Sequence, residues 1–301
     1  MAQGGVSRRA LLTAAALFPL AGCGDRHRPL TTRPGPPRPS APPDTAEFAA
    51  LEKKYKARLG LFALSTANGA TVAYRADERF AFCSTFKPLA AAAVLDRHPL
   101  SHLDDRVRIN AADVNSISPI TKGRIGGTMT VRELCDAAIR VSDGTAGNLL
   151  VRDIGGPAQL NAYLRRLGDG VTRMDNLEPE LNRDRPGDPR DTTTPRAIAG
   201  NFQKLVLGNA LPADKHDLLK DWLERARTGG TRIRAALPPG WKIAHKTGSG
   251  DYGRCNDVAV LWPENKPPIV LAVLSDREGY NTPMAEPLLA EAAKLALTHL
   301  T

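Results

Sequence analysis

The sequence predicts an α+β fold in which a five-stranded antiparallel sheet, built from both ends of the globular part, is flanked by helices. Three observations support this prediction: two strand-like runs near the start of the globular part, three near the end of the chain, and helical periodicity between them. The five runs are residues 59–64, 71–74, 241–244, 258–262 and 269–274. Their short connections favour antiparallel neighbours. The sheet is therefore expected to enclose an inserted helical subdomain.

The composition is that of an ordinary globular protein. Of the 301 residues, 42% are apolar and 24% are charged. These values exclude a wholly disordered, a collagen-like and a multi-span membrane chain. The 4 cysteines are too few for a disulfide scaffold in a chain of this length.

The first 22 residues are predicted to be a signal peptide of the twin-arginine type. Arg8 and Arg9 precede an apolar run over residues 10–20, which has about half the length of a membrane-spanning helix. Leu20-Ala21-Gly22-Cys23 follows and resembles a bacterial lipobox, in which the cysteine is lipidated and becomes the mature N-terminus. The alternative is a soluble secreted protein whose Cys23 is removed with the signal.

Residues 23–43 are predicted to form a lipidated, proline-rich tether. The density of proline favours an extended polyproline II conformation, with a rise of about 3.1 Å per residue. The globular part then covers residues 44–301. Within it we expect an α/β part at about 44–75 and 225–301, and a helical part at about 76–224.

The net charge of +9 is concentrated near the N-terminus. Arg8 and Arg9 supply +2, residues 23–43 supply +3, and +4 is left for residues 44–301. The globular part has no basic stripe with interleaved aromatic residues, so a nucleic-acid partner is not expected. The positive tether is better suited to the surface of an anionic membrane.

Helices are expected at both ends of the globular part. Apolar residues recur at helical spacing over residues 45–58, and again over residues 283–300. Between the first two strands, Asn68-Gly69 is a strong signal for a hairpin turn.

The middle of the chain shows helical runs that stop frequently. Thr130 and Glu133 have the spacing of a capping box ahead of one such run. Residues 175–191 are rich in Pro, Arg and Asp and have little periodicity. We interpret them as a long loop, and loops of this length within a compact domain tend to be functional.

Ser84 and Lys87 carry the first chemical signal. If Ser84 opens the helical run 89–95, Lys87 lies across the same face of the first turn, and Pro88 is tolerated there. The serine then has a neighbouring amine that can take its proton, and the helix N-terminus favours developing negative charge. The structural alternative is a helix cap beside a lysine that reaches solvent, which is the commoner meaning of Ser-x-x-Lys alone.

Three further fragments accompany this pair. They are Ser142-Asp143-Gly144, Glu178-Pro179-Glu180-Leu181-Asn182 and Lys246-Thr247-Gly248-Ser249-Gly250. Taken singly, each is more simply interpreted as a turn, a solvated loop or a strand end. Taken together, the order and spacing of all four resemble class A serine β-lactamases of the penicillin-recognising enzyme superfamily, over about residues 45–300.

The resemblance implies a three-layer α/β/α fold and hydrolysis of β-lactam antibiotics through a covalent acyl-serine intermediate, with no cofactor. Ser84 would be the nucleophile, and either Lys87 or Glu178 would be the base for acylation, a choice that the family leaves open. Glu178 would activate a water for deacylation and Asn182 would hold that water. Ser142 would pass a proton to the leaving lactam nitrogen.

The resemblance also implies a substrate-binding set. Lys246, Thr247 and Ser249 would receive the substrate carboxylate. Arg232 matches an arginine found in some members and would be a further partner of that carboxylate. The backbone amides of Ser84 and Ser249 would form the oxyanion hole.

Several residues depart from the usual pattern of the family. Most relatives have Asn at the position of Gly144, although some actinobacterial members also have Gly there. The glycine lacks the side-chain amide that would bind the substrate. Ile117 stands where an aromatic residue is frequent at the pocket mouth, so we expect a wider pocket at both positions. Cys255 replaces an arginine that is common on this strand, and Arg232 would take over its role.

Two further departures concern charge. Asn176 stands where many members have an arginine that pairs with a loop aspartate, here Asp191, so the loop is expected to be less tightly fastened. His245 precedes Lys246 where an aspartate is usual, and a neutral imidazole there would alter the local charge.

The remaining cysteines and histidines carry no predicted function. Cys83, Cys135 and Cys255 are expected to be free thiols. The 6 histidines show no paired metal-ligand spacing, so no metal site is expected. The expected partners are a β-lactam and water, and the protein is expected to be a monomer.

Two other functions remain as alternatives. A D-Ala-D-Ala peptidase shares the Ser-x-x-Lys and Lys-Thr-Gly motifs but generally lacks the water-activating Glu178. A surface lipoprotein that binds β-lactams without turnover would acylate Ser84 and stall. In each case the leader predicts an exported protein, anchored through Cys23 at the cell surface or the periplasmic side, or else secreted.

Overall fold

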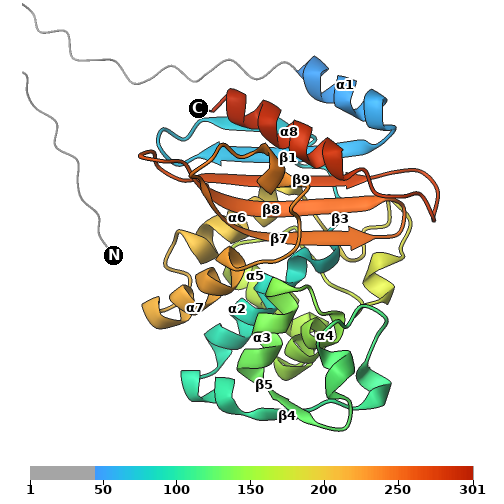
Figure 1. Cartoon of the computed structure of the whole chain (residues 1–301), viewed down its shortest axis with the longest axis vertical. Coiled ribbons are helices and arrows are strands. Elements are labelled where there is room, and N and C mark those ends of the chain that lie inside the picture. The colour runs from blue at the N-terminus through green and yellow to red at the C-terminus, as the bar shows by residue number, and fades with distance from the viewer. Residues whose placement is uncertain (1–44, 301) are drawn as a thin grey trace, which may run out of the picture. The chain divides into compact units, whose positions relative to one another are not determined.

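Strands from the two ends of the chain pair into one antiparallel sheet in the order β2-β1-β9-β8-β7 (Figure 1). The computed structural model describes residues 45–300. The strands are β1 (Arg58–Ser65), β2 (Thr71–Tyr74), β7 (Lys242–Gly250), β8 (Arg254–Trp262) and β9 (Ile269–Asp276). β1 and β9 join the two ends, with Arg58 opposite Asp276 and Ser65 opposite Ile269. The predicted five-stranded sheet is confirmed.

Both faces of this sheet are covered. Ala272 of β9 belongs to the core shared with the helical part, whereas its neighbour Val273 belongs to the core under the terminal helices. The terminal helices are α1 (Thr45–Tyr55) and α8 (Glu286–Thr298), and α6 (Pro195–Val206) packs on β1, β8 and β9 from the other side (Figure 1). Burial on both faces explains the near-continuous apolar runs of the strands. It also produces the predicted three layers.

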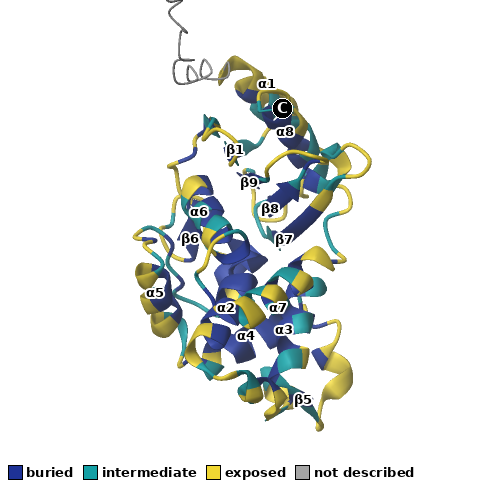
Figure 2. Ribbon diagram, turned by 90° about the vertical axis from the view of Figure 1, so that its left-hand side faces the viewer, coloured by how far each residue is buried: buried dark blue, intermediate teal, exposed yellow. Residues whose placement is uncertain are grey.

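The helical part is organised around two buried helices. Its helices are α2 (Lys87–Arg97), α3 (Val131–Arg140), α4 (Gly144–Asp153), α5 (Pro157–Arg166) and α7 (Ala213–Glu224). Figure 2 shows α2 and α4 at the buried centre and α5 with an exposed outer side. Small side chains at Ala90–Ala93 of α2 allow its neighbours to approach closely. The predicted capping box is present at the start of α3, where Thr130 and Glu133 bond each other's backbone.

Element ends differ from the prediction where pairing overrides the local pattern. α1 ends at Tyr55, because Arg58 already pairs with Asp276 at the start of β1. β7 continues to Gly250, so the fragment from Lys246 onward is part of the sheet.

Two short ladders in the middle of the chain were not predicted. They pair β3 (Phe80–Ala81) with β6 (Thr192–Thr193), and β4 (Arg106–Arg108) with β5 (Thr128–Thr130). Strands of two or three residues are too short to show a period of two, so the sequence pattern does not reveal them.

The structure gives no view of the predicted leader. The signal peptide 1–22, the lipidated Cys23 and the tether 23–43 all lie outside the described residues. Within residues 45–300, no helix combines the length and the apolar character that a membrane crossing requires.

The three cysteines of the described part, Cys83, Cys135 and Cys255, are buried free thiols. Burial raises the pKa of Cys83 to about 12 and that of Cys255 to about 12. A buried thiol of this kind is not a nucleophile, although Cys83 is adjacent to Ser84.

Candidate active site

Ser84 lies immediately before α2. The chain arrives through Cys83, whose φ of 48° is left-handed, and the 3-10 helix η1 (Cys83–Phe86) leads directly into α2 at Lys87. Ser84 is 7% exposed and Lys87 is fully buried. Lys87 Nζ donates a hydrogen bond to Ser84 Oγ over 2.8 Å. The predicted proximity of the serine and the amine is therefore confirmed.

Glu178 brings a carboxylate to the same point from the long loop. Ser84 Oγ donates to Glu178 Oε1 over 2.7 Å, and Lys87 Nζ lies 3.1 Å from the Glu178 carboxylate. Asn148 of α4 holds this loop residue, since its Nδ2 donates to the Glu178 carbonyl over 2.7 Å and its Oδ1 accepts from the Glu178 amide over 2.9 Å. Asn148 was not predicted as a site residue, because the burial of its amide is a property of the folded structure and is not visible in the sequence.

Ser142 bridges the two lysines of the site. Its hydroxyl accepts hydrogen bonds from Lys246 Nζ over 2.8 Å and from Lys87 Nζ over 3.4 Å, and its carbonyl accepts from Lys87 over 2.8 Å. Ser142 has a left-handed φ of 60°, and Asp143 then caps α4 by accepting from the Ala146 amide. The break that the sequence predicted here therefore directs a serine toward both amines.

Burial sets the charge balance of this cluster. Burial lowers the pKa of Lys87, and the Glu178 carboxylate opposes that shift. Burial and then the charge of Lys87 hold the pKa of Lys246 well below its usual range. Both lysines thus release a proton more readily than a solvated amine does, so a neutral amine is accessible next to Ser84.

The space beside Gly144 is filled by other side chains. A Cβ at Gly144 would lie 2.3 Å from Glu178 Oε2 and 2.8 Å from Asn115 Nδ2. The missing side chain therefore makes room for these two groups and does not simply widen the pocket. Ile117 is 46% exposed, and its carbonyl accepts from the Gly144 amide over 2.6 Å.

Arg232 and Ser249 come together at the end of β7. Arg232 is buried, and its Nη2 donates to Ser249 Oγ over 2.9 Å and to Glu286 Oε1 over 2.9 Å. Glu286, which the sequence analysis missed, neutralises part of the charge that a substrate carboxylate would use. The Thr247 hydroxyl is 2.8 Å from that of Thr228.

Asn182 lies buried in the same loop as Glu178. Its carbonyl accepts from Arg254 Nη1 over 2.7 Å, which holds the backbone in place. Among residues 45–300, neither its Nδ2 nor its Oδ1 has a hydrogen-bond partner. Buried polar atoms of this kind are usual partners for water, so the amide suits the predicted water-holding role.

The loop is fastened without the arginine that the family often uses. The fully buried Asp191 accepts from Asn176 Nδ2 over 2.7 Å, from the Asn176 amide over 3.0 Å and from the Asp175 amide over 2.7 Å. Three hydrogen bonds thus close the loop at Asp191, and the expectation that it is less tightly fastened than in relatives with the arginine stays a prediction. The hydrogen bonds lower the pKa of Asp191, but burial outweighs them and raises it.

His245 lies on the opposite face of β7 from Lys246. It is fully buried, and its Nδ1 is 2.9 Å from Asp257 Oδ1 on the neighbouring strand, while its Nε2 is 3.2 Å from Arg234 Nη2. His245 therefore belongs to a buried polar group behind the strand. It does not directly contact the serine cluster, which is formed by Ser84, Lys87, Ser142, Glu178 and Lys246.

The prediction that the histidines show no paired metal-ligand spacing is wrong. His98 and His102 are four residues apart, and with Asp153 they form a group that could hold a metal ion. The spacing of the two histidines is visible in the sequence, whereas the carboxylate that completes the group is 51 residues further along the chain than His102. The group lies away from Ser84, at the other end of α2.

Comparison with known proteins identifies the family to which this arrangement belongs. The sequence pattern of the beta-lactamase enzyme family matches residues 45–300. A beta-lactamase of Mycobacterium tuberculosis is 54% identical over 301 residues, covering 97% of each chain. Beta-lactamase FAR-1 of Nocardia farcinica is 50% identical, covering 97% of this chain and 96% of its own.

A solved structure agrees with these relatives. The crystal structure of a beta-lactamase from Desulfarculus baarsii superposes with a TM-score of 0.82 at 47% identity, and the match covers 85% of this chain and 98% of that one. The two chains therefore share the same fold.

A pH-dependent stability is predicted from Asp191. Burial raises the pKa of Asp191 in the folded state, whereas an aspartate in the unfolded chain has a pKa of about 3.9. The folded state therefore keeps the carboxyl proton of Asp191 to a higher pH than the unfolded state does. The wild type should therefore lose stability relative to Asp191→Asn as the pH rises through this window. Chemical denaturation at a series of pH values measures the difference.

Asp188→Asn is the matched control, because Arg190 lowers the pKa of Asp188 to about 2. The stability that Asp188 supplies is present above its unfolded pKa and is lost as the pH falls, so this variant should show the opposite sign. The same sign for both variants would contradict the assignment.

Proposed function

The chain belongs to the beta-lactamase enzyme family, and we propose that it is a class A serine enzyme with Ser84 as its nucleophile. It hydrolyses β-lactam antibiotics and so confers resistance to them. The observation that carries the proposed mechanism is the position of Ser84 Oγ, 2.8 Å from Lys87 Nζ and 2.7 Å from Glu178 Oε1. A hydroxyl with an amine and a carboxylate both within hydrogen-bond distance is equipped to lose its proton as it attacks.

Acylation begins when Ser84 Oγ attacks the lactam carbonyl carbon and its proton passes to Lys87 or Glu178. The backbone amides of Ser84 and Ser249 stabilise the oxyanion that forms. When the carbon–nitrogen bond breaks, Ser142 donates its hydroxyl proton to the nitrogen. The contact of Ser142 Oγ with Lys87, at 3.4 Å, allows that proton to be replaced.

Substrate orientation depends on charge at the end of β7. Lys246, Ser249 and Arg232 would receive the carboxylate of the antibiotic, with the Thr247 hydroxyl beside them. Because Glu286 already pairs with Arg232 at 2.9 Å, we assign the larger part of this attraction to Lys246. Gly144 and Ile117 would contact the acylamino side of the substrate.

Deacylation returns the enzyme to its starting state. Glu178 takes a proton from a water held by Asn182, and the water oxygen attacks the ester carbonyl carbon. The bond from that carbon to Ser84 Oγ then breaks, and Glu178 returns its proton to the serine oxygen. This step distinguishes a β-lactamase from the two alternatives, the D-Ala-D-Ala peptidase and the non-turnover binding protein. The buried Glu178 and its support by Asn148 favour the β-lactamase.

The first prediction concerns turnover. The purified protein should convert many equivalents of a chromogenic cephalosporin, because Glu178 and Asn182 provide for release of the acyl group. Stopped-flow absorbance at a large excess of substrate measures this. A burst of one equivalent followed by no further reaction would overturn the hydrolytic function.

A second prediction isolates deacylation. Glu178→Gln keeps the shape of the side chain but removes the proton acceptor, so turnover should fall by about 10²–10⁴-fold. Removal of the carboxylate also lowers the pKa of Lys87 further, since Glu178 opposes the effect of burial. Ser84 should therefore still acylate, and mass spectrometry should show the adduct on intact protein.

Glu180→Gln is the control for this experiment, because Glu180 lies in the same loop, is mostly exposed and pairs with Arg183. It should retain normal turnover and no lasting adduct. If Glu178→Gln forms no adduct under saturating penicillin, the separation of the two steps is refuted.

Export and anchoring form the last part of the proposal. We propose a twin-arginine signal over residues 1–22 and a lipid on Cys23, which would hold the enzyme at the outer side of the membrane as a monomer. The match to the mycobacterial relative covers 97% of this chain and supports a shared leader. Cys23→Ser should move the enzyme from the membrane fraction to the soluble fraction, as measured by fractionation and immunoblotting. An unchanged membrane fraction would contradict lipidation.

A further inference from the structure

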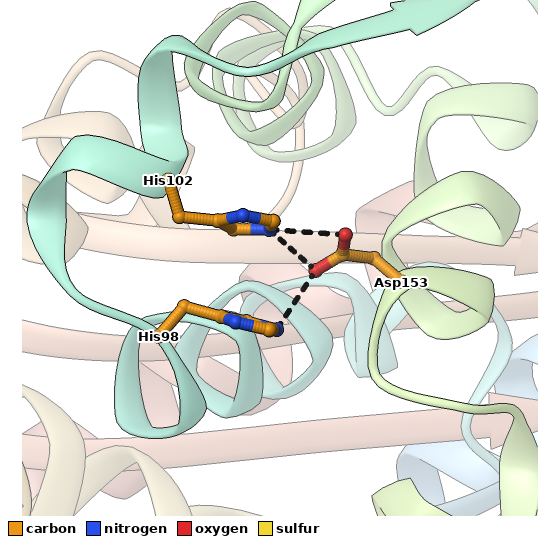
Figure 3. Close-up of side chains that lie close together, drawn as sticks. All are labelled: His98, His102 and Asp153. Carbon is orange, nitrogen blue, oxygen red and sulfur yellow. Dashed lines mark hydrogen bonds and ion pairs between the residues drawn. The ribbon is translucent and has the colours of Figure 1, made fainter.

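Two histidines and an aspartate meet where α2 and α4 end. His98 directly follows α2, His102 lies in the 3-10 helix η2 (Leu100–Asp104), and Asp153 is the last residue of α4. Figure 3 shows the two imidazole rings side by side, with a nitrogen of each directed toward the Asp153 carboxylate. Three ligands, of the two types imidazole and carboxylate that zinc accepts, therefore converge from different elements.

The distances in this group fit a metal ion. His98 Nε2 lies 3.4 Å from Asp153 Oδ2, and His102 Nε2 lies 3.0 Å from Asp153 Oδ1. The ligand atoms all lie within 4.8 Å of one another. Tetrahedral zinc, with bonds of about 2.0–2.2 Å, places its ligand atoms about 3.3 Å apart. The ring centroids are 3.9 Å apart and the ring planes are inclined at 21°, so the rings must rotate for both nitrogens to point at one ion.

Two observations favour a metal over a simple ion pair. A protonated His102 bonded to Asp153 would satisfy that histidine, but His98 Nε2 is buried and makes no hydrogen bond within residues 45–300. In addition, His102 Nδ1 lies 2.9 Å from Asp105 Oδ2, which orients the ring with Nε2 directed at Asp153. A carboxylate behind a ligating histidine is the usual outer-shell arrangement of a metal site.

The surroundings allow an ion from solvent to reach the three side chains. The side chains of His98, His102 and Asp153 are 24%, 18% and 19% exposed, so solvent reaches the group. A metal requires its imidazole ligands in the neutral form. Arg97 lies close by, but its Nη1 is engaged by the Ile154 carbonyl at 2.9 Å.

We propose that His98, His102 and Asp153 bind one Zn²⁺, with water as the fourth ligand and Asp105 as a positioning residue. Two nitrogen ligands select zinc over magnesium or calcium, which prefer oxygen. Binding releases to solvent any proton held by the imidazole nitrogens. Because the 11 residues of α2 span about 16 Å, the ion is too far from Ser84 to take part in the chemistry.

The ion would act as a structural clamp. α2 begins at Lys87 and α4 begins at Gly144, so the helices that carry the serine cluster at one end are joined at the other. A ligand that binds the folded state alone raises its stability. Zinc should therefore stabilise the helical part against unfolding without changing the reaction.

The test uses the untagged, purified protein after treatment with a chelator. Titration with Zn²⁺ against a chromophoric chelator should show one ion per chain, and saturating Zn²⁺ should raise the midpoint of thermal unfolding while Mg²⁺ does not. Asp153→Asn and His98→Asn should lose both effects, and Asp105→Asn should weaken Zn²⁺ binding by about 10- to 100-fold. Cephalosporin turnover should be unaffected by the ion.

His299→Asn is the matched control, because His299 also lies near a carboxylate, at 3.2 Å from Glu47, but residues 45–300 place no second histidine beside it. This variant should bind Zn²⁺ like the wild type. Absence of stoichiometric binding in the wild type, or equal affinity in Asp153→Asn, would overturn the proposal. Both measurements are independent of catalytic activity, so they can fail while the proposed function stands.

Discussion

The buried ammonium group of Lys87 is the interaction on which the rest of the site depends. An ammonium removed from water is very costly unless charged and hydrogen-bonding partners surround it. Here Ser84, the carbonyl of Ser142 and the carboxylate of Glu178 fill that role, and they come from the 3-10 helix η1, the turn before α4 and the long loop. The three elements must therefore assemble together, because the absence of any one removes a partner of the buried amine, and the absence of the long loop removes its counter-charge.

Close approach to this lysine requires positions without side chains. A Cβ at Gly147 of α4 would lie 2.9 Å from Lys87 Cε, and one at Gly248 of β7 would lie 2.8 Å from the Phe82 carbonyl. Gly144 likewise leaves space for the Glu178 carboxylate. The glycines thus permit a helix, a strand and a loop to meet around one charged group, where larger residues would hold them apart.

The two-residue period of β7 places Lys246 and His245 on opposite faces of the strand. Lys246 faces the serine cluster, whereas His245 faces the other way and meets Asp257 within the sheet. An unusual residue next to a proposed catalytic lysine is thereby accommodated by the opposite face. The length of α2 likewise separates two sites, because Lys87 lies in its first turn and His98 follows its last residue.

The sequence by itself determined the features that are local or rhythmic: five apolar strands, the capping box at Thr130, and Lys87 one turn after Ser84. Four motifs in order were also enough to indicate the family, because chemistry restricts which residue types can occupy them. Only the tertiary structure showed that Asn148 supports Glu178, that Glu286 shares Arg232, and that Asp153 meets His98. These contacts join residues far apart in the chain, and no local pattern encodes which distant side chain a folded backbone brings within 3 Å or so.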